Sequence, residues 1–240
     1  MIKRIAMILL ALCVLFSAVF ACAESWDDDA PGGIPAGKNT GLGGAGGVWG
    51  DLGEFMTMGG YGVTTFDSGD FRYQLSEDGQ YAVLVAYLGT EENVAFPEQL
   101  DGIPVAAVGN AMCVCNEVIT NLVIPGSVRY IGTNAFANCR NLKSVVLQEG
   151  VTSLGTCCFG GCTELEKIVF PESLEVVSDF VFANCRKLQE IAFGRNLQSI
   201  GTQAFAKCAA LSLVTIPGGS AVSIGTEAFS ECAPDIRIIN

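Results

Sequence analysis

One nine-residue pattern recurs five times in the C-terminal half of this 240-residue chain. The first copy runs from Ile131 to Cys139. The later copies end at Cys162, Cys185, Cys208 and Cys232. The period is 23 residues at each step except the last, where one extra residue makes it 24. A short fixed period is typical of a solenoid, in which each unit is one coil that buries its apolar side only by stacking on its neighbours.

Each period contains three segments with different patterns. The segment Leu142–Leu147 has apolar residues in alternation, which is typical of a short half-buried strand, so successive coils are expected to pair these strands into a parallel sheet. The segment Val151–Gly155 predicts a turn marked by glycine. In Cys158–Cys162, the Phe and the second Cys are spaced as i and i+3, which places them on one face of a helical turn. The sequence therefore predicts coils made of a strand, a turn and a short α or 3₁₀ turn.

The combined pattern resembles that of a known repeat family. Leu-x-x-Val-x-Leu followed by Ile-Gly-x-x-Ala-Phe-x-x-Cys, at this period, is similar to the BspA-like leucine-rich repeats of bacterial surface proteins. The resemblance covers residues 108–240 and reaches back to Val94–Pro97, with Met112 and Cys113 replacing Ala-Phe in the first copy. It implies an α/β solenoid of leucine-rich-repeat coils with a parallel β-sheet on one face, and adhesion to proteins on host or bacterial surfaces.

The N-terminus predicts export. Residues 1–23 combine two basic residues, an apolar core at Ile5–Phe20 and a possible cleavage site at Ala21–Ala23. We expect cleavage after Ala23 and a secreted or cell-surface location. An uncleaved anchor and lipidation at Cys22 are the alternatives, and only these two would attach the chain to a membrane.

The remaining chain divides into three predicted parts. Residues 24–60 form a linker, because residues 31–60 alone contain twelve glycines. Residues 61–107 form an N-terminal β cap, in which Phe71–Leu75 and Tyr81–Tyr87 make a hairpin around an Asp78-Gly79 turn. Residues 108–240 form the leucine-rich-repeat solenoid, with about six repeats.

The charge excludes some partners. With the two basic residues of the export signal removed, 11 basic and 25 acidic residues remain, a net charge of −14. A chain this acidic is not expected to bind nucleic acid or anionic lipid.

Eleven cysteines in an exported chain usually indicate disulfides, but here the repeat favours another interpretation. Five of them share one position of the period, so we predict a column of reduced thiols buried along the solenoid beside a column of rings. This predicted core consists of Phe136, Cys139, Phe159, Cys162, Phe182, Cys185, Phe205, Cys208, Phe229 and Cys232. Cys113 and Cys115 lie outside the column and are the remaining candidates for redox or metal chemistry.

The sequence does not indicate an enzyme. The chain has no His, which removes Ser-His-Asp and Cys-His nucleophile systems, and it has no phosphate-binding Gly-Lys-Ser/Thr loop. The glutamates of neighbouring coils are expected to be solvated surface residues. We therefore predict no catalytic residue, no cofactor and no metal site.

Strand residues that flank the inward positions are expected to point outward and to line up from coil to coil. The candidate binding residues are Ser144, Val146, Lys167, Val169, Glu190 and Ala192. A polar column beside an apolar column is typical of a protein-binding surface, so the leading prediction is a non-catalytic protein-binding module of the adhesion type. A surface scaffold that self-associates through its open end is the alternative. A carbohydrate-binding module is a third hypothesis, which the absence of aromatic residues in these columns disfavours.

Overall fold

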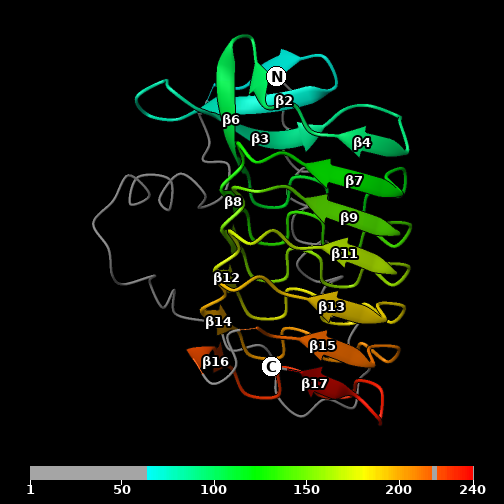
Figure 1. Ribbon diagram of the computed structural model, residues 1–240. Helices are drawn as coiled ribbons and strands as arrows, with labels where there is room; N and C mark the ends of the chain where they lie inside the picture. Colours follow the sequence, from blue (N-terminus) through cyan, green and yellow to red (C-terminus); the bar gives the residue numbers. More distant parts are fainter. Residues whose placement is uncertain (1–63, 218–220, 240) are drawn as a thin grey trace. The chain divides into compact units, whose positions relative to one another are not determined.

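The structure is a computed structural model that describes residues 64–217 and 221–239. The predicted export signal and glycine-rich linker lie outside the described residues. Within them the chain winds into a parallel β-solenoid of about seven turns (Figure 1). This confirms the predicted leucine-rich-repeat solenoid with a parallel sheet.

One side of the solenoid is formed by the strands that the alternating pattern predicted. We call this side the front sheet. Its seven strands are β4 (Asn93–Ala95), β7 (Asn121–Ile124), β9 (Ser144–Leu147), β11 (Lys167–Val169), β13 (Glu190–Ala192), β15 (Leu213–Thr215) and β17 (Arg237–Ile239). Neighbouring strands pair in parallel, one repeat apart. The ladder is interrupted between β11 and β13, so the front sheet consists of a four-stranded and a three-stranded part.

The interruption coincides with a change of side chain inside the coils. Phe170 and Phe193 occupy the inward position where other coils have Ile124, Leu147 or Ile216, and their rings stack at 4.8 Å. Phe193 is buried and Phe170 is half-buried, and both rings also contact a ring of the Phe column edge-on, Phe170 at Phe182 and Phe193 at Phe205.

A second sheet forms the opposite side of the coils and extends over the N-terminal end of the solenoid (Figure 1). We call it the back sheet. Its strands are β1 (Phe66–Ser68), β2 (Phe71–Leu75), β3 (Ala82–Tyr87), β5 (Gln99–Leu100), β6 (Ile103–Val108), β8 (Tyr130–Ile131), β10 (Ser153–Leu154), β12 (Val176–Val177), β14 (Ser199–Ile200) and β16 (Ser223–Ile224).

The back sheet corrects one prediction for the repeat. The segment Val151–Gly155, predicted as a turn, contains strand β10, which pairs in parallel with β8 and β12. The strand is followed by glycine in four of the five copies, where the coils stack closely, and by Ser178 in the remaining one. A Cβ at Gly132 would lie 2.6 Å from the carbonyl carbon of Gly109, which is closer than real contacts allow.

The third side of each coil corrects the predicted helical turn. It consists of turns in which N–H groups that bond to the next coil alternate with N–H groups that bond three residues back in the same turn, so these turns are not a regular helix. Phe136 N–H donates to Cys158 O at 2.8 Å, and Asn138 N–H donates to Gly160 O at 2.7 Å. Asn134 and Asn138 have φ values of 56° and 58°, in the left-handed region that Asn tolerates. The alternating backbone conformation directs these N–H groups towards the next coil.

The predicted hairpin is present at the N-terminal end. β2 and β3 pair antiparallel, and β3 pairs in parallel with β6. Ser68 Oγ and Tyr73 Oη donate to the carboxylate of Asp101 at 2.8 and 2.9 Å, which ties β1 and β2 to the turn before β6. Residues 93–108 form a coil that precedes the first repeat identified in the sequence, because β4 pairs in parallel with β7.

Candidate functional site

The front sheet directs alternate side chains outward, because successive side chains of a strand point to opposite faces. Inward residues such as Leu122, Val145 and Val214 are buried. The outward residues form two columns that run from coil to coil. The first column consists of Asn93, Asn121, Ser144, Lys167, Glu190, Leu213 and Arg237, and the second of Ala95, Val123, Val146, Val169, Ala192, Thr215 and Ile239.

All six candidate binding residues lie in these columns. The pair on β9 is half-buried, and the pairs on β11 and β13 are exposed. Val169 is 40% exposed, so a large apolar side chain reaches solvent near the middle of the face. The interruption of the ladder separates the pair on β13 from the other two pairs.

The first column changes character along the solenoid. Asn121 Nδ2 donates to Asn93 Oδ1 at 2.6 Å, and Ser144 Oγ donates to Asn121 Oδ1 at 2.5 Å. After this neutral ladder the column continues with the charged residues Lys167 and Glu190. The face thus offers hydrogen-bonding groups and charges of both signs beside an apolar strip, a combination suited to contact with another protein.

The predicted core column lies inside the coils, away from this face. Phe136, Phe159, Phe182 and Phe205 are almost completely buried, and their rings stack nearly parallel at 5.1–5.5 Å. Phe229 continues the stack at 5.4 Å from Phe205 but is only partly buried. The ring column therefore holds adjacent coils together and has no surface for a ligand.

The column thiols are also structural. Cys162 Sγ donates to Phe136 O at 3.2 Å, and Cys185 Sγ donates to Phe159 O at 3.3 Å. The same bond recurs for Cys139, Cys208 and Cys232, each to a carbonyl of the preceding coil. No disulfide occurs among the nine cysteines of the described residues.

Burial makes these thiols poor nucleophiles. Desolvation raises the pKa of Cys113 to about 12 and the pKa of Cys232 to about 11. Since the thiolate is the reactive and metal-binding form, the buried thiols are chemically inert near neutral pH. Cys113 and Cys115, which sequence analysis grouped together, differ in setting because Cys113 is buried and Cys115 is exposed.

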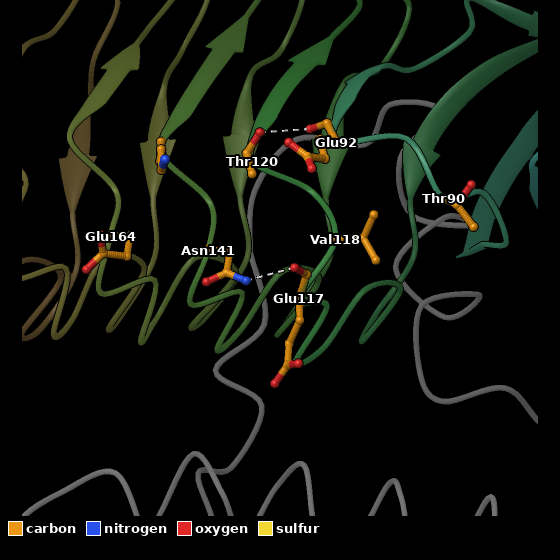
Figure 2. A pocket seen from close by; sticks show the side chains of 8 residues that line it. Thr90, Glu92, Glu117, Val118, Thr120, Asn141 and Glu164 are labelled. Atoms are coloured by element: carbon orange, nitrogen blue, oxygen red, sulfur yellow. Dashed lines mark hydrogen bonds between the residues drawn. The ribbon is translucent and has the colours of Figure 1, made fainter.

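A polar hollow of about 520 Å³ lies beside the front sheet, where the chain enters β4, β7 and β9 (Figure 2). Its lining residues are Thr90, Glu92, Glu117, Val118, Thr120, Asn141, Lys143 and Glu164. The repeat pattern of the sequence did not predict this hollow. The sequence does contain a pattern that could have predicted it. Glu92, Thr120 and Lys143 each stand one residue before a front-sheet strand, so the repeat places them side by side in neighbouring coils.

Two side-chain bonds to backbone carbonyls shape the polar hollow. Asn141 Nδ2 donates to Glu117 O at 2.8 Å, and Thr120 Oγ1 donates to Glu92 O at 3.2 Å. At its far end Glu164 forms an ion pair of 2.5 Å with Lys187. The hollow thus offers carboxylates and hydroxyls for hydrogen bonding. Within the described part of the chain, no group of three or more Cys, Asp or Glu residues is placed to hold a metal ion.

The repeats match an established family. Six copies of the BspA-type leucine-rich repeat region cover residues 108–234, which is more than half of the chain. This chain belongs to that family. The resemblance seen in the Phe and Cys registers is therefore confirmed, and the BspA-type repeat accounts for the solenoid over residues 108–234.

Solved structures share the solenoid. A leucine-rich cell surface protein from Faecalibacterium prausnitzii is 25% identical, with a TM-score of 0.57, over 73% of this chain and 54% of that one. The T. pallidum leucine-rich repeat protein is 30% identical, with a TM-score of 0.52, over 73% of this chain and 71% of that one. A leucine-rich repeat protein from Bacteroides ovatus, at 21% identity and a TM-score of 0.52, shares the fold. This chain spans only about half the length of the F. prausnitzii protein.

No curated protein matches this BspA-type chain significantly in sequence. Within residues 64–217 and 221–239, no helix has the length and apolar character needed to cross a membrane.

Proposed function

We propose that this chain is a non-catalytic protein-binding module of the adhesion type, and that the two outward columns of the front sheet form its recognition surface. The observation that supports this proposal most strongly is the exposed apolar strip around Val169, which lies beside a polar and charged column. An interface core of this kind excludes water from apolar contacts, while the flanking polar groups fix register. The partner class is a protein on a host or bacterial surface.

The proposed location follows from different observations. The sequence of residues 1–23 resembles an export signal, and one similar structure is that of a leucine-rich cell surface protein. We infer secretion or surface display, cleavage after Ala23, and a linker over residues 24–60 between the cleavage site and the folded part. Mass spectrometry of the mature N-terminus tests the cleavage position, and a start at residue 24 is the expected result.

The test of the binding surface introduces negative charge into the apolar column. Val146→Glu combined with Val169→Glu should leave the fold intact, because both side chains reach the surface, but it should abolish capture of the partner because an interface centre cannot bury an unpaired carboxylate. The full chain is used to capture proteins from the surface fraction of its natural setting, and the captured protein is then tested against the double variant.

The two single variants serve as controls, since adjacent glutamates on parallel strands repel each other. Arg129→Glu, which makes the same change of two negative charges at an exposed residue directly before β8 of the back sheet, controls for net charge. A folded double variant that retains the partner would refute this surface.

A scaffold role is the second candidate, favoured by the exposed apolar residues Ile224, Ile238 and Ile239 on the last described coil. Exposed apolar residues at such a density indicate a contact surface. Light scattering coupled to size-exclusion chromatography decides between the two, because a scaffold should grow in mass with concentration and a recognition module should stay monomeric.

A further inference from the structure

The front sheet ends at β4, which has a strand partner on one side only. Asn121 N–H donates to Glu92 O at 3.0 Å, and Phe96 N–H donates to Val123 O at 2.9 Å. Because successive residues of a strand direct their backbone groups to opposite edges, residues 92, 94 and 96 face β7. The N–H and C=O groups of Asn93 and Ala95 therefore face the other edge. Both residues are exposed, and these four groups have no backbone partner among the described residues.

The edge of β4 differs from the N-terminal edge of the back sheet. There the antiparallel strands β1–β3 continue the sheet beyond β6 and cover the end of the core with Phe71 and Tyr87. Proteins usually protect an exposed edge with Lys, Pro, a bulge or a very short strand. The three residues of β4 include neither Lys nor Pro, and Pro97 stands two positions beyond the strand. The front sheet thus presents a short edge that can still pair.

The surroundings of this edge are acidic. Residues 73–128 contain seven Asp or Glu residues and no Lys or Arg. Glu91 and Glu92 precede β4, and Glu98 follows it. Glu92 and Glu117 also line the polar hollow, which begins beside β4 and in which Glu164 and Lys143 lie further along, next to β9 and β11 (Figure 2). An extended segment placed on this edge would therefore lie among carboxylates at both of its ends.

We propose that the β4 edge binds an extended, basic polypeptide segment by strand addition. Asn93 and Ala95 supply the backbone hydrogen bonds, and Glu92 and Glu117 in the polar hollow receive Lys or Arg side chains of the segment. Four backbone bonds alone bind weakly, because each replaces bonds to water, so the charges are needed for both affinity and selection. The inference rests on the proposed function, since it specifies the partner chemistry at one end of the same sheet.

The test uses a fluorescent ten-residue peptide of alternating Thr and Lys, with blocked ends, titrated with the full chain and followed by fluorescence anisotropy. A second peptide has the same sequence with every backbone nitrogen methylated, so that charge is kept and the N–H donors are lost. A third replaces Lys by Glu. We expect saturable binding of the first peptide, binding at least about tenfold weaker for the methylated peptide, and no binding of the Glu peptide.

Protein variants test the carboxylates. Glu92→Gln with Glu117→Gln should weaken binding of the Thr-Lys peptide about tenfold, since two ionic contacts are lost. The matched control is Glu77→Gln, an exposed acid in the hairpin turn away from β4, which should bind like the parent.

Three outcomes overturn the inference. They are no saturable binding by the full chain, equal binding of the methylated peptide, and equal binding by the Glu92→Gln/Glu117→Gln variant. Binding seen only after removal of residues 24–63 would assign the edge to the chain's own N-terminal segment. If the peptide fails while Val146→Glu/Val169→Glu still loses its captured partner, the proposed function stands and only this inference falls.

Discussion

Phe182 is stacked on both sides in the ring column. Its ring lies 5.5 Å from Phe159 and 5.1 Å from Phe205, and its side chain has no exposed surface. A residue in this position contributes both apolar burial and ring contacts to three coils. The sequence predicts this role well, because the repeat period places one Phe per coil at the same inward position.

Phe182→Ala should destabilise the chain by roughly 3–5 kcal/mol, since truncation of a buried aromatic leaves a cavity that packed coils fill only partly. Urea unfolding followed by circular dichroism measures the change in unfolding free energy. Phe229→Ala is the matched control at the partly buried end of the column, where the loss should be smaller. A loss below about 1 kcal/mol for Phe182→Ala would contradict its place in the core.

The buried thiols make stability depend on pH in the alkaline range. Desolvation raises the pKa of Cys113 from 9.0 to about 12, so the unfolded chain loses this proton first. The stabilising contribution is complete below pH 9 and declines as the pH rises towards 12. Between pH 8 and 10.5 the stability of Cys113→Ala should fall by about 2 kcal/mol less than that of the parent.

The sequence did not predict the backbone conformation of individual residues in the turns. Asn134, Cys157 and Phe180 occupy the same place in successive coils, and their φ values are 56°, 58° and 58°. No common residue type marks this place, because the constraint comes from hydrogen bonds to the next coil. Spacing alone cannot distinguish such a turn from the helical turn that Phe and Cys at i and i+3 predicted.

At the scale of elements, strand length decided what could be predicted. Ser144–Leu147 spans two full alternations and was predicted as a strand, whereas Ser153–Leu154 has two residues and shows no period. The short strands are held by stacking of identical coils rather than by local propensity. The polar hollow was missed for a related reason, since its residues come from different coils.

The Asp101 contact with β1 and β2 gives a prediction for the N-terminal hairpin. Hydrogen bonds from the Ser68 and Tyr73 hydroxyls lower the pKa of Asp101 below its usual value of 3.8. Its contribution is therefore present above about pH 4 and is lost as the pH falls. Asp101→Asn suits the local φ of 51° but removes the charge, so amide exchange in β1 and β2 should speed up.

Hydrogen–deuterium exchange at neutral pH measures this change, with Asp70→Asn as the control in the neighbouring β1–β2 turn. Exchange in β9 and β11 should stay as slow as in the parent. Unchanged exchange in β1 and β2 would show that Asp101 does not hold the hairpin.

At the scale of the molecule, the repeat determines the fold but leaves the partner open. Inward positions carry apolar residues at the same spacing in every coil, so their pattern predicted the solenoid and its family. Outward positions such as Ser144, Lys167 and Glu190 differ from coil to coil, because packing does not constrain them. A single sequence cannot separate positions that recognise a ligand from ordinary surface variation.

The central claim is that the outward columns of the front sheet are the recognition surface. The most direct measurement is an exchange footprint of the full chain, recorded alone and saturated with the protein that it captures. We expect slower exchange in β7, β9 and β11, centred on Val146 and Val169, with no change in β8, β10 and β12 of the back sheet. Slower exchange confined to the back sheet, or to the hairpin at Phe71–Tyr87, would contradict the account.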